Sequence, residues 1–129
     1  MAENVHPECK TREELLAFQL EGLRWSVPHA YNGSSHYRAS FDKAGVKPED
    51  IQTLDDIRKL PFVASKDLQE GYPFPLLSVP MKDVVRIHAS SGTTGKRKIM
   101  SYTAKDVEDW AEMFARCYAY TGCTVEDRI

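Results

Sequence analysis

The hydrophobic period of this chain changes near residue 84, and that change limits the folds it can adopt. Before it, apolar residues recur at helical spacing between signals that start and stop helices. At the change, the stretch DVVRIHA (83–89) becomes β-branched and alternating, which is typical of a strand. The sequence therefore predicts a helical part followed by a part that contains a sheet.

Four helices are predicted in the first part. Thr11-Arg-Glu-Glu14 matches a capping box, and Asn32-Gly33 ends the helix that follows it. The other three are expected at 35–44, 54–60 and 66–70, stopped by Gly45, Pro61 and Gly71, with Ser65 as the N-cap of the last. Leucine, tryptophan and aromatic residues should form the core of this module, and Trp25 is expected in that core or at an interface.

The second part is predicted to be a hairpin followed by a long helix. The proline-rich stretch GYPFPLLSVP (71–80) should be an extended connector, with strands at 84–88 and 99–102. Thr103 is expected to cap a helix with an apolar stripe of Val107, Trp110 and Phe114, ending near Gly122. The final TVEDRI is expected to approach a further strand. We thus predict a mixed α/β fold, with a helical module over 1–75 and the truncated start of a larger α/β domain over 76–129.

The stretch between the two predicted strands is rich in glycine and hydroxyl groups. Glycines allow backbone N–H groups to approach a phosphate, hydroxyls add donors, and lysine adds charge. The spacing matches neither the Walker A pattern nor the dinucleotide pattern G-x-G-x-x-G. From spacing alone, a phosphate loop and a plain hairpin connection both remain open. The candidate ligands of a phosphate are Ser90, Ser91, Gly92, Thr93, Thr94, Gly95 and Lys96.

Composition excludes several other classes of protein. The chain has 129 residues and a formal net charge of -2, which disfavours a nucleic-acid binder that relies on a basic surface. It shows no signal peptide and no run long enough to span a membrane. Its three cysteines have no C-x-x-C spacing, so we expect a reduced, cytoplasmic protein. Cys9 and His6 lack two further ligands for a metal site, and no metal site is predicted.

Other polar residues are expected to be structural. His88 lies next to the loop, but a lone histidine there is more often structural than a general base. Asp106, Glu108 and Asp109 are read as a solvated helix face. None of these residues is therefore predicted to be catalytic.

Longer stretches of the sequence resemble a known family. SSGTTGK after a strand is similar to the phosphate loop of adenylate-forming enzymes, the acyl-CoA synthetase superfamily. The stretches LEGLRWSVPHAY, HYRASFDKAGVKPEDIQTLDDIRKLPFVASKDLQEGYPFPLLSVPMKDVVRIHASSGTTGK and YTAKDVEDWAEMFAR look like the N-terminal region of the phenylacetate-CoA ligase family. The resemblance runs from about Thr11 to Ile129.

The resemblance implies an ATP-dependent ligase with Mg²⁺ and coenzyme A. Phenylacetate would be activated to an acyl-adenylate with release of pyrophosphate, and the coenzyme A thiol would then give phenylacetyl-CoA and AMP. The loop residues 90–96 would hold the β and γ phosphates of ATP. In this family the aryl pocket and the catalytic lysine lie further along the chain, so no catalytic residue is expected within residues 1–129, and this chain alone is expected to be inactive. A homodimer is expected for a full-length ligase, and the open sheet edge of this chain is expected to allow self-association. Neither nucleic acid nor membrane is expected as a partner.

One position departs from the family pattern, and two other functions stay open. Arg97 stands where the family usually has proline, so the exit of the loop is expected to be looser. The substrate could be another aryl acid, such as indoleacetate. Alternatively, the chain could be a small non-catalytic domain that binds a nucleotide or a partner.

Overall fold

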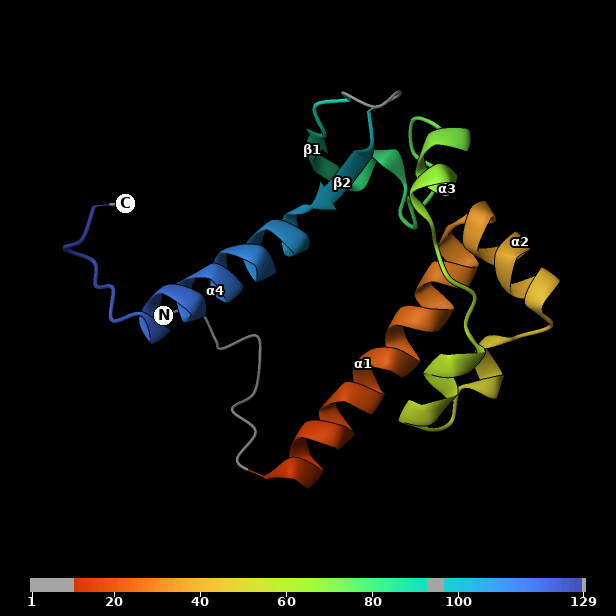
Figure 1. The fold of residues 1–129 in the computed structure, drawn as a ribbon, viewed down its shortest axis with the longest axis horizontal. Helices are drawn as coiled ribbons and strands as arrows, with labels where there is room; N and C mark the ends of the chain where they lie inside the picture. The colour runs from red at the N-terminus through yellow and green to blue at the C-terminus, as the bar shows by residue number, and fades with distance from the viewer. Residues whose placement is uncertain (1–10, 93–96, 129) are drawn as a thin grey trace.

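The fold is mixed α/β, as predicted, in the computed structural model, which describes residues 11–92 and 97–128 (Figure 1). Within these residues the chain forms helices, short 3₁₀ helices (η) and one two-stranded antiparallel sheet. In chain order the elements are α1 (Arg12–Gly33), α2 (Ser35–Ala44), η1 (Pro48–Asp50), η2 (Leu54–Lys59), α3 (Ser65–Glu70), η3 (Met81–Asp83), β1 (Val84–Ala89), β2 (Ile99–Thr103) and α4 (Ala104–Tyr120). The predicted boundary between two domains near residue 75 stays a prediction.

The ends of the first two helices follow the predicted signals. The Thr11 hydroxyl accepts from the Glu14 N–H at 3.1 Å, and the Glu14 carboxylate accepts from the Thr11 N–H at 3.1 Å. This reciprocal pair is the capping box that the sequence predicts. At the end of α2, Gly45 adopts φ 69°, a left-handed conformation that glycine tolerates best.

Two later helices differ from prediction. Residues 54–59 form a 3₁₀ helix, where an ordinary helix to Leu60 was expected. Ala64, and not Ser65, is the N-cap of α3, so the predicted cap is wrong by one residue. The physical reason is that the Asp67 carboxylate accepts from the Ala64 N–H at 2.6 Å, which satisfies a terminal donor without a capping hydroxyl.

The core of the helical part is small and excludes Trp25. Among the residues that the structure describes, the buried apolar ones are Val27, Phe41, Val46 and Ile51. Trp25 is 65% exposed and stacks on His29 with ring centroids 4.6 Å apart. The prediction that Trp25 lies in this core is therefore wrong. Successive helical residues turn by about 100°, so Trp25 and Val27 lie on nearly opposite sides of α1.

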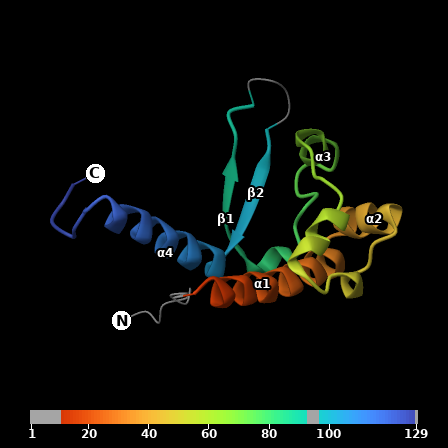
Figure 2. The ribbon, with the colours of Figure 1, turned by 60° about the horizontal axis from the view of Figure 1, so that its bottom comes forward.

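The connector 71–80 returns to the corner between α1 and α2. Ser34 is 2% exposed, and its hydroxyl donates to the Pro75 carbonyl at 3.0 Å and accepts from the Tyr37 N–H at 3.3 Å. Gly33 lies so close to Ser78 that an added Cβ would stand 2.0 Å from the Ser78 carbonyl oxygen. These contacts place the hairpin between the helical part and α4, as both views show (Figures 1 and 2).

The hairpin and α4 pack through aromatic rings on one face of the sheet. Ile87 pairs with Ser101 and His88 with Met100, with an irregularity in register between Val84 and Arg86. The ring of Trp110 on α4 stacks on Tyr102 at 5.7 Å and meets His88 edge-on at 5.3 Å. His88 thus has a packing role.

The chain after α4 forms turns over its described residues. Thr124 and Asp127 close one of them, with the Asp127 carboxylate accepting from the Thr124 N–H at 2.7 Å. The expected approach to a strand is therefore not seen at 121–128. No helix among the described residues is long and apolar enough to cross a membrane.

Candidate functional site

The glycine-rich loop starts from the last hydrogen-bonded residues of the hairpin. Beyond the strand pair Ala89–Ile99, the Ser90 N–H donates to the Lys98 carbonyl at 3.0 Å. The Lys98 N–H donates back to the Ser90 hydroxyl at 3.0 Å. We call these two bonds the loop base. One backbone bond and one bond to a side-chain hydroxyl thus join the two residues that follow the strand pair, and they fix where the loop leaves the sheet.

The loop base changes what Ser90 can offer to a ligand. The predicted role of Ser90 is that of a hydroxyl donor to phosphate. Its oxygen already accepts a bond from the Lys98 N–H, and its own hydroxyl proton remains available for donation. Ser90 can therefore serve the loop base and a ligand at the same time.

Ser91 and Gly92 continue the loop away from the sheet. Ser91 is exposed, and Gly92 adopts φ 73°, which favours glycine and turns the backbone sharply. The predicted ligands Thr93, Thr94, Gly95 and Lys96 lie outside the described residues. The structure thus brings together Ser90, Ser91 and Gly92 of the seven predicted residues.

The loop exit is basic. Arg97 is exposed and Lys98 is partly buried, and both follow directly on the loop. The Lys98 backbone, through the loop base, is a positioning group that sequence reasoning missed. The register of the two strands could have revealed it, because the residue opposite Ser90 is the one next to Ile99 on the loop side. The alternation of apolar residues alone does not give that register, since it does not fix the length of the loop.

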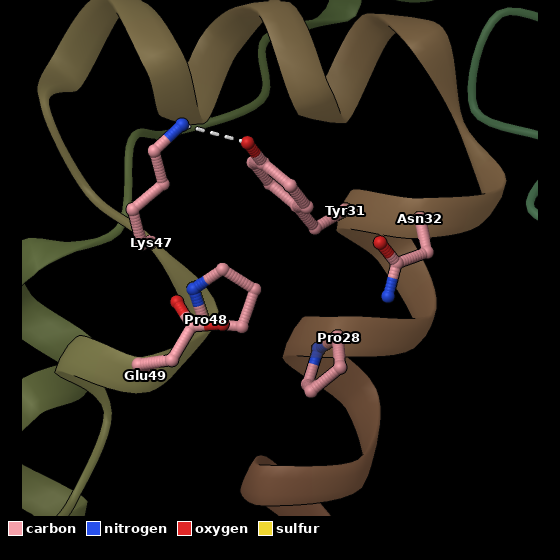
Figure 3. A pocket seen from close by; sticks show the side chains of 6 residues that line it. All are labelled: Pro28, Tyr31, Asn32, Lys47, Pro48 and Glu49. Carbon is pink, nitrogen blue, oxygen red and sulfur yellow. Dashed lines mark hydrogen bonds between the residues drawn. The ribbon is translucent and has the colours of Figure 1, made fainter.

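A separate pocket lies on the helical part, between the end of α1 and η1 (Figure 3). It has a volume of about 390 Å³. Its lining residues come from α1 and from the segment that opens η1: Pro28, Tyr31, Asn32, Lys47, Pro48 and Glu49. Sequence reasoning missed this pocket, because no motif marks it.

The charge of Lys47 in this pocket is neutralised by its neighbours. Lys47 donates to the Tyr31 hydroxyl at 2.7 Å and to the Asp42 carboxylate, while the Tyr31 hydroxyl donates to the same carboxylate at 2.7 Å. The hydrogen bond to Asp42, and next the one to Tyr31, raises the pKa of Lys47. The bonds from Lys47 and then Tyr31 lower the pKa of Asp42. Lys47 is thus held as an ammonium group and is unsuited to act as a base or nucleophile.

The acidic residues do not gather into a metal centre within the described ranges. No group of three or more His, Cys, Asp or Glu side chains in residues 11–92 and 97–128 could hold a metal ion. Asp106 is exposed, as predicted for a solvated helix face, and it completes the capping box of α4 by accepting from the Thr103 N–H at 2.7 Å. The Asp109 carboxylate pairs with Lys105 one turn away.

Comparison with known proteins confirms the resemblance that the sequence indicates. The chain is 47% identical over 122 residues to a phenylacetate-coenzyme A ligase of Aromatoleum evansii and 45% identical to one of Escherichia coli K12. Each match covers 95% of this chain and 28% of the relative, so the chain spans about a quarter of the length of these relatives. No protein-family model matches the chain.

Solved structures show the same fold. A 2-hydroxyisobutyryl-CoA ligase, crystallised with 2-HIB-AMP and CoA in the thioesterification state, superposes with a TM-score of 0.74 at 27% identity. The superposition covers 84% of this chain and 24% of that one. A second structure of that ligase, in the postadenylation state, gives a TM-score of 0.75 at 21% identity over 93% of this chain.

Proposed function

We propose that this chain, similar over 95% of its length to phenylacetate-CoA ligases, is the part of an arylacetate-CoA ligase that holds the phosphates of ATP. The observation that carries the proposal is the loop base, which fixes the point at which the chain leaves the sheet at Ser90 and returns to it at Lys98. The described residues fit a polyphosphate, because Ser90 and Ser91 carry hydroxyl donors and Gly92 turns the backbone without a side chain. Thr93, Thr94, Gly95 and Lys96 complete the proposed set.

The proposed chemistry has two steps. In the first, an oxygen of the arylacetate carboxylate attacks the α phosphorus of ATP, and the bond to pyrophosphate breaks. In the second, the thiol of coenzyme A attacks the acyl carbon of the adenylate, loses its proton and releases AMP, which leaves the thioester. Negative charge grows on the departing pyrophosphate in the first step. The preorganised hydrogen-bond donors of the loop stabilise this charge.

The remaining partners follow from the same proposal. Mg²⁺ would arrive with ATP, and coenzyme A is the second substrate. We place the ligase in the cytoplasm as a homodimer, without a nucleic-acid or membrane partner. The net charge of -2 supports the absence of nucleic acid, because a binder that relies on electrostatics carries a basic surface.

The test uses the full-length protein that carries this segment. We expect ATP–pyrophosphate exchange that depends on an added carboxylic acid and is strongest with phenylacetate. Replacing Lys96 with methionine removes one charge-assisted bond of about 1.5–3 kcal/mol, so exchange should fall about 10- to 100-fold. Steady-state exchange rates with saturating acid would measure this fall.

A matched control separates the loop from its basic surroundings. Lys98→Met removes a nearby cation but keeps both backbone groups of the loop base, so its exchange rate should change less than threefold. If none of the aryl acids tested supports exchange, the proposed ligase activity is wrong. If the two variants lose equal activity, the proposed role of Lys96 is wrong.

The choice of acid rests on the relatives and not on the fold. The superposed ligase is named for 2-hydroxyisobutyrate, an aliphatic acid, and yet it shares this fold. The four ligases that match at 41–47% identity are all named for phenylacetate. A panel of phenylacetate, indoleacetate and 2-hydroxyisobutyrate would decide between these acids by the rate of exchange.

A further inference from the structure

Helix α4 presents an apolar stripe that continues past the hairpin. The rings of Trp110, Phe114 and Tyr118 follow one another along the helix, with centroids 5.7 and 6.2 Å apart. Trp110 packs on Tyr102 of the hairpin, but the later part of α4 points away from the sheet in both ribbon views (Figures 1 and 2). Met113, Phe114 and Tyr118 are 48, 49 and 40% exposed. We call Trp110, Met113, Phe114 and Tyr118 the α4 stripe.

Charged residues of α4 lie on its other side. Successive residues of a helix turn by about 100°, which places Glu108 and Glu112 roughly opposite the α4 stripe. Arg116 pairs with Glu112 at 2.9 Å, and Lys105 pairs with Asp109, so these charges are satisfied along the helix. An apolar partner can therefore cover the α4 stripe without burying a charge.

A helix with such an uncovered face is weakly stable by itself. Helices in proteins gain most of their stability from packing of the apolar face, and isolated helices of about 12–15 residues are marginal in water. α4 has 17 residues, and Trp110, which packs on the hairpin, lies in its first half. A partner that covers the second half would therefore stabilise it.

The exposed apolar surface is too large and too scattered for a second copy of this chain to cover. The accessible surface exceeds that of a compact monomer by ~3,000 Å², whereas each partner in a standard interface buries ~800 Å². Ile87 on β1 is 50% exposed, and Trp25 and Phe62 in the helical part are 65% and 100% exposed. These observations favour a partner larger than the chain itself.

The relatives contain a partner of that size within their own chains. This chain spans 28% of the phenylacetate-CoA ligases that it matches. It also superposes on 24% of the 2-hydroxyisobutyryl-CoA ligase with a TM-score of 0.74. The same fold therefore occurs there as part of a much longer chain.

We propose that the α4 stripe is the surface on which the rest of a full-length ligase packs against this segment. The surface that meets the stripe is apolar, and the charged side of α4 stays in solvent. The proposal rests on the proposed place of this chain within a ligase, but not on the role of the phosphate loop.

Amide hydrogen exchange of α4 tests the proposal in the 129-residue chain and in the full-length protein that carries this segment. We expect the amides of 113–120 to exchange at least ~100-fold more slowly in the full-length protein, because packing then stabilises the helix. Amides of α2, whose Phe41 lies in the buried core of the helical part, should differ less. Neither ATP nor an acid is added, so a protein without ligase activity can still pass this test.

Two substitutions on different sides of α4 locate the covered face. In the full-length protein, Phe114→Ala should speed the exchange of 113–120 at least ~10-fold, because a covered phenylalanine loses its packing. In the 129-residue chain the same change removes only ring contacts along the helix, so the effect should be less than about threefold. Glu108→Ala, on the charged side, should change exchange less than about threefold in both proteins.

Three results would overturn the proposal. The first is equal exchange of α4 in the two unsubstituted proteins, which needs no variant to fold. The second is exchange in the chain alone that slows, as its concentration rises, to the rate of the full-length protein, because the partner is then a second copy. The third is an equal effect of Phe114→Ala and Glu108→Ala in the full-length protein, because the α4 stripe is then not the covered face.

Discussion

Gly33 lies in close contact with the connector, against the main chain of Ser78. An added Cβ there would lie 2.0 Å from the carbonyl oxygen of Ser78 and 2.6 Å from its carbonyl carbon. Atoms of the main chain cannot swing aside as the end of a flexible side chain can. A side chain at position 33 must therefore push the two segments apart.

We expect Gly33→Ala to lower the free energy of unfolding by about 1–3 kcal/mol, the usual cost of overpacking. Gly22→Ala is the matched control, because its added Cβ meets nothing within 4 Å. Alanine is the better helix former by up to about 1 kcal/mol, so this control should be stabilising. Urea unfolding of both variants measures the difference, and a stabilising Gly33→Ala would show that the close approach is not maintained in solution.

Trp25 shows what single residues do not reveal in advance. A large apolar side chain is normally expected inside, yet Val27 and not Trp25 faces the core. Both residues are apolar and lie in the same helix, so either could have faced the core. Which side of α1 is buried depends on how α1 packs against α2 and η1. That arrangement comes from contacts between segments, which the local sequence does not contain.

Helix caps are the features at the scale of elements that were predicted best. The boxes at Thr11 and Thr103 were predicted from four residues each, because their hydrogen bonds join positions three apart. The start of α3 was missed by one residue, since Asp67 supplies the bond and Ala64 contributes only its N–H. The 3₁₀ form of η2 was also missed, since it differs from an ordinary helix by a small shift in hydrogen bonding.

Removing a hydroxyl from one N-cap and adding one to another tests whether these caps stabilise their helices. Thr103→Ala removes the hydroxyl that accepts from the Asp106 N–H at 3.2 Å, and we expect a loss of about 1 kcal/mol in stability. Ala64→Ser adds a hydroxyl at an N-cap that has none, and should gain up to about 1 kcal/mol. Thermal unfolding followed by circular dichroism would measure both. If both variants gain stability, or both lose it, the capping hydroxyl is not what stabilises these helices.

The whole molecule exposes more surface than a compact protein of its mass. Its accessible surface is 9946 Å², against ~6,900 Å² for a compact monomer of this size. Part of that surface is apolar, since Met113, Phe114 and Tyr118 on α4 are each at least 40% exposed. The small core of the helical part agrees with this open shape.

We expect this openness to lower the denaturant dependence of unfolding. An unfolded chain of this mass exposes ~21,000 Å², so unfolding here uncovers only about four fifths of the area that a compact protein would. Because the m-value scales with that area, it should be about a fifth below that of compact proteins of this length. A urea titration gives m directly, and an m-value typical of compact proteins would show that the chain closes up in solution.

The candidate site was predicted only in part, because some of its residues are consecutive in the sequence and others are far apart in it. The composition of the phosphate loop was visible in the sequence, since its residues are consecutive. The loop base was not, because it needs the register of two strands. The pocket between α1 and η1 was not predicted at all, since it joins two segments that only the fold brings together.

The hydrogen bond from Ser34 to Pro75 has a consequence for the order of events during synthesis. Its two residues are 41 positions apart, yet both precede the first strand. The buried core around Val27, Phe41 and Ile51 is also complete before that point. A ribosome that has released Pro75 has thus supplied every residue of this core and its closing bond. The helical part can therefore fold, with Pro75 of the connector already bound to it, before the hairpin has left the ribosome.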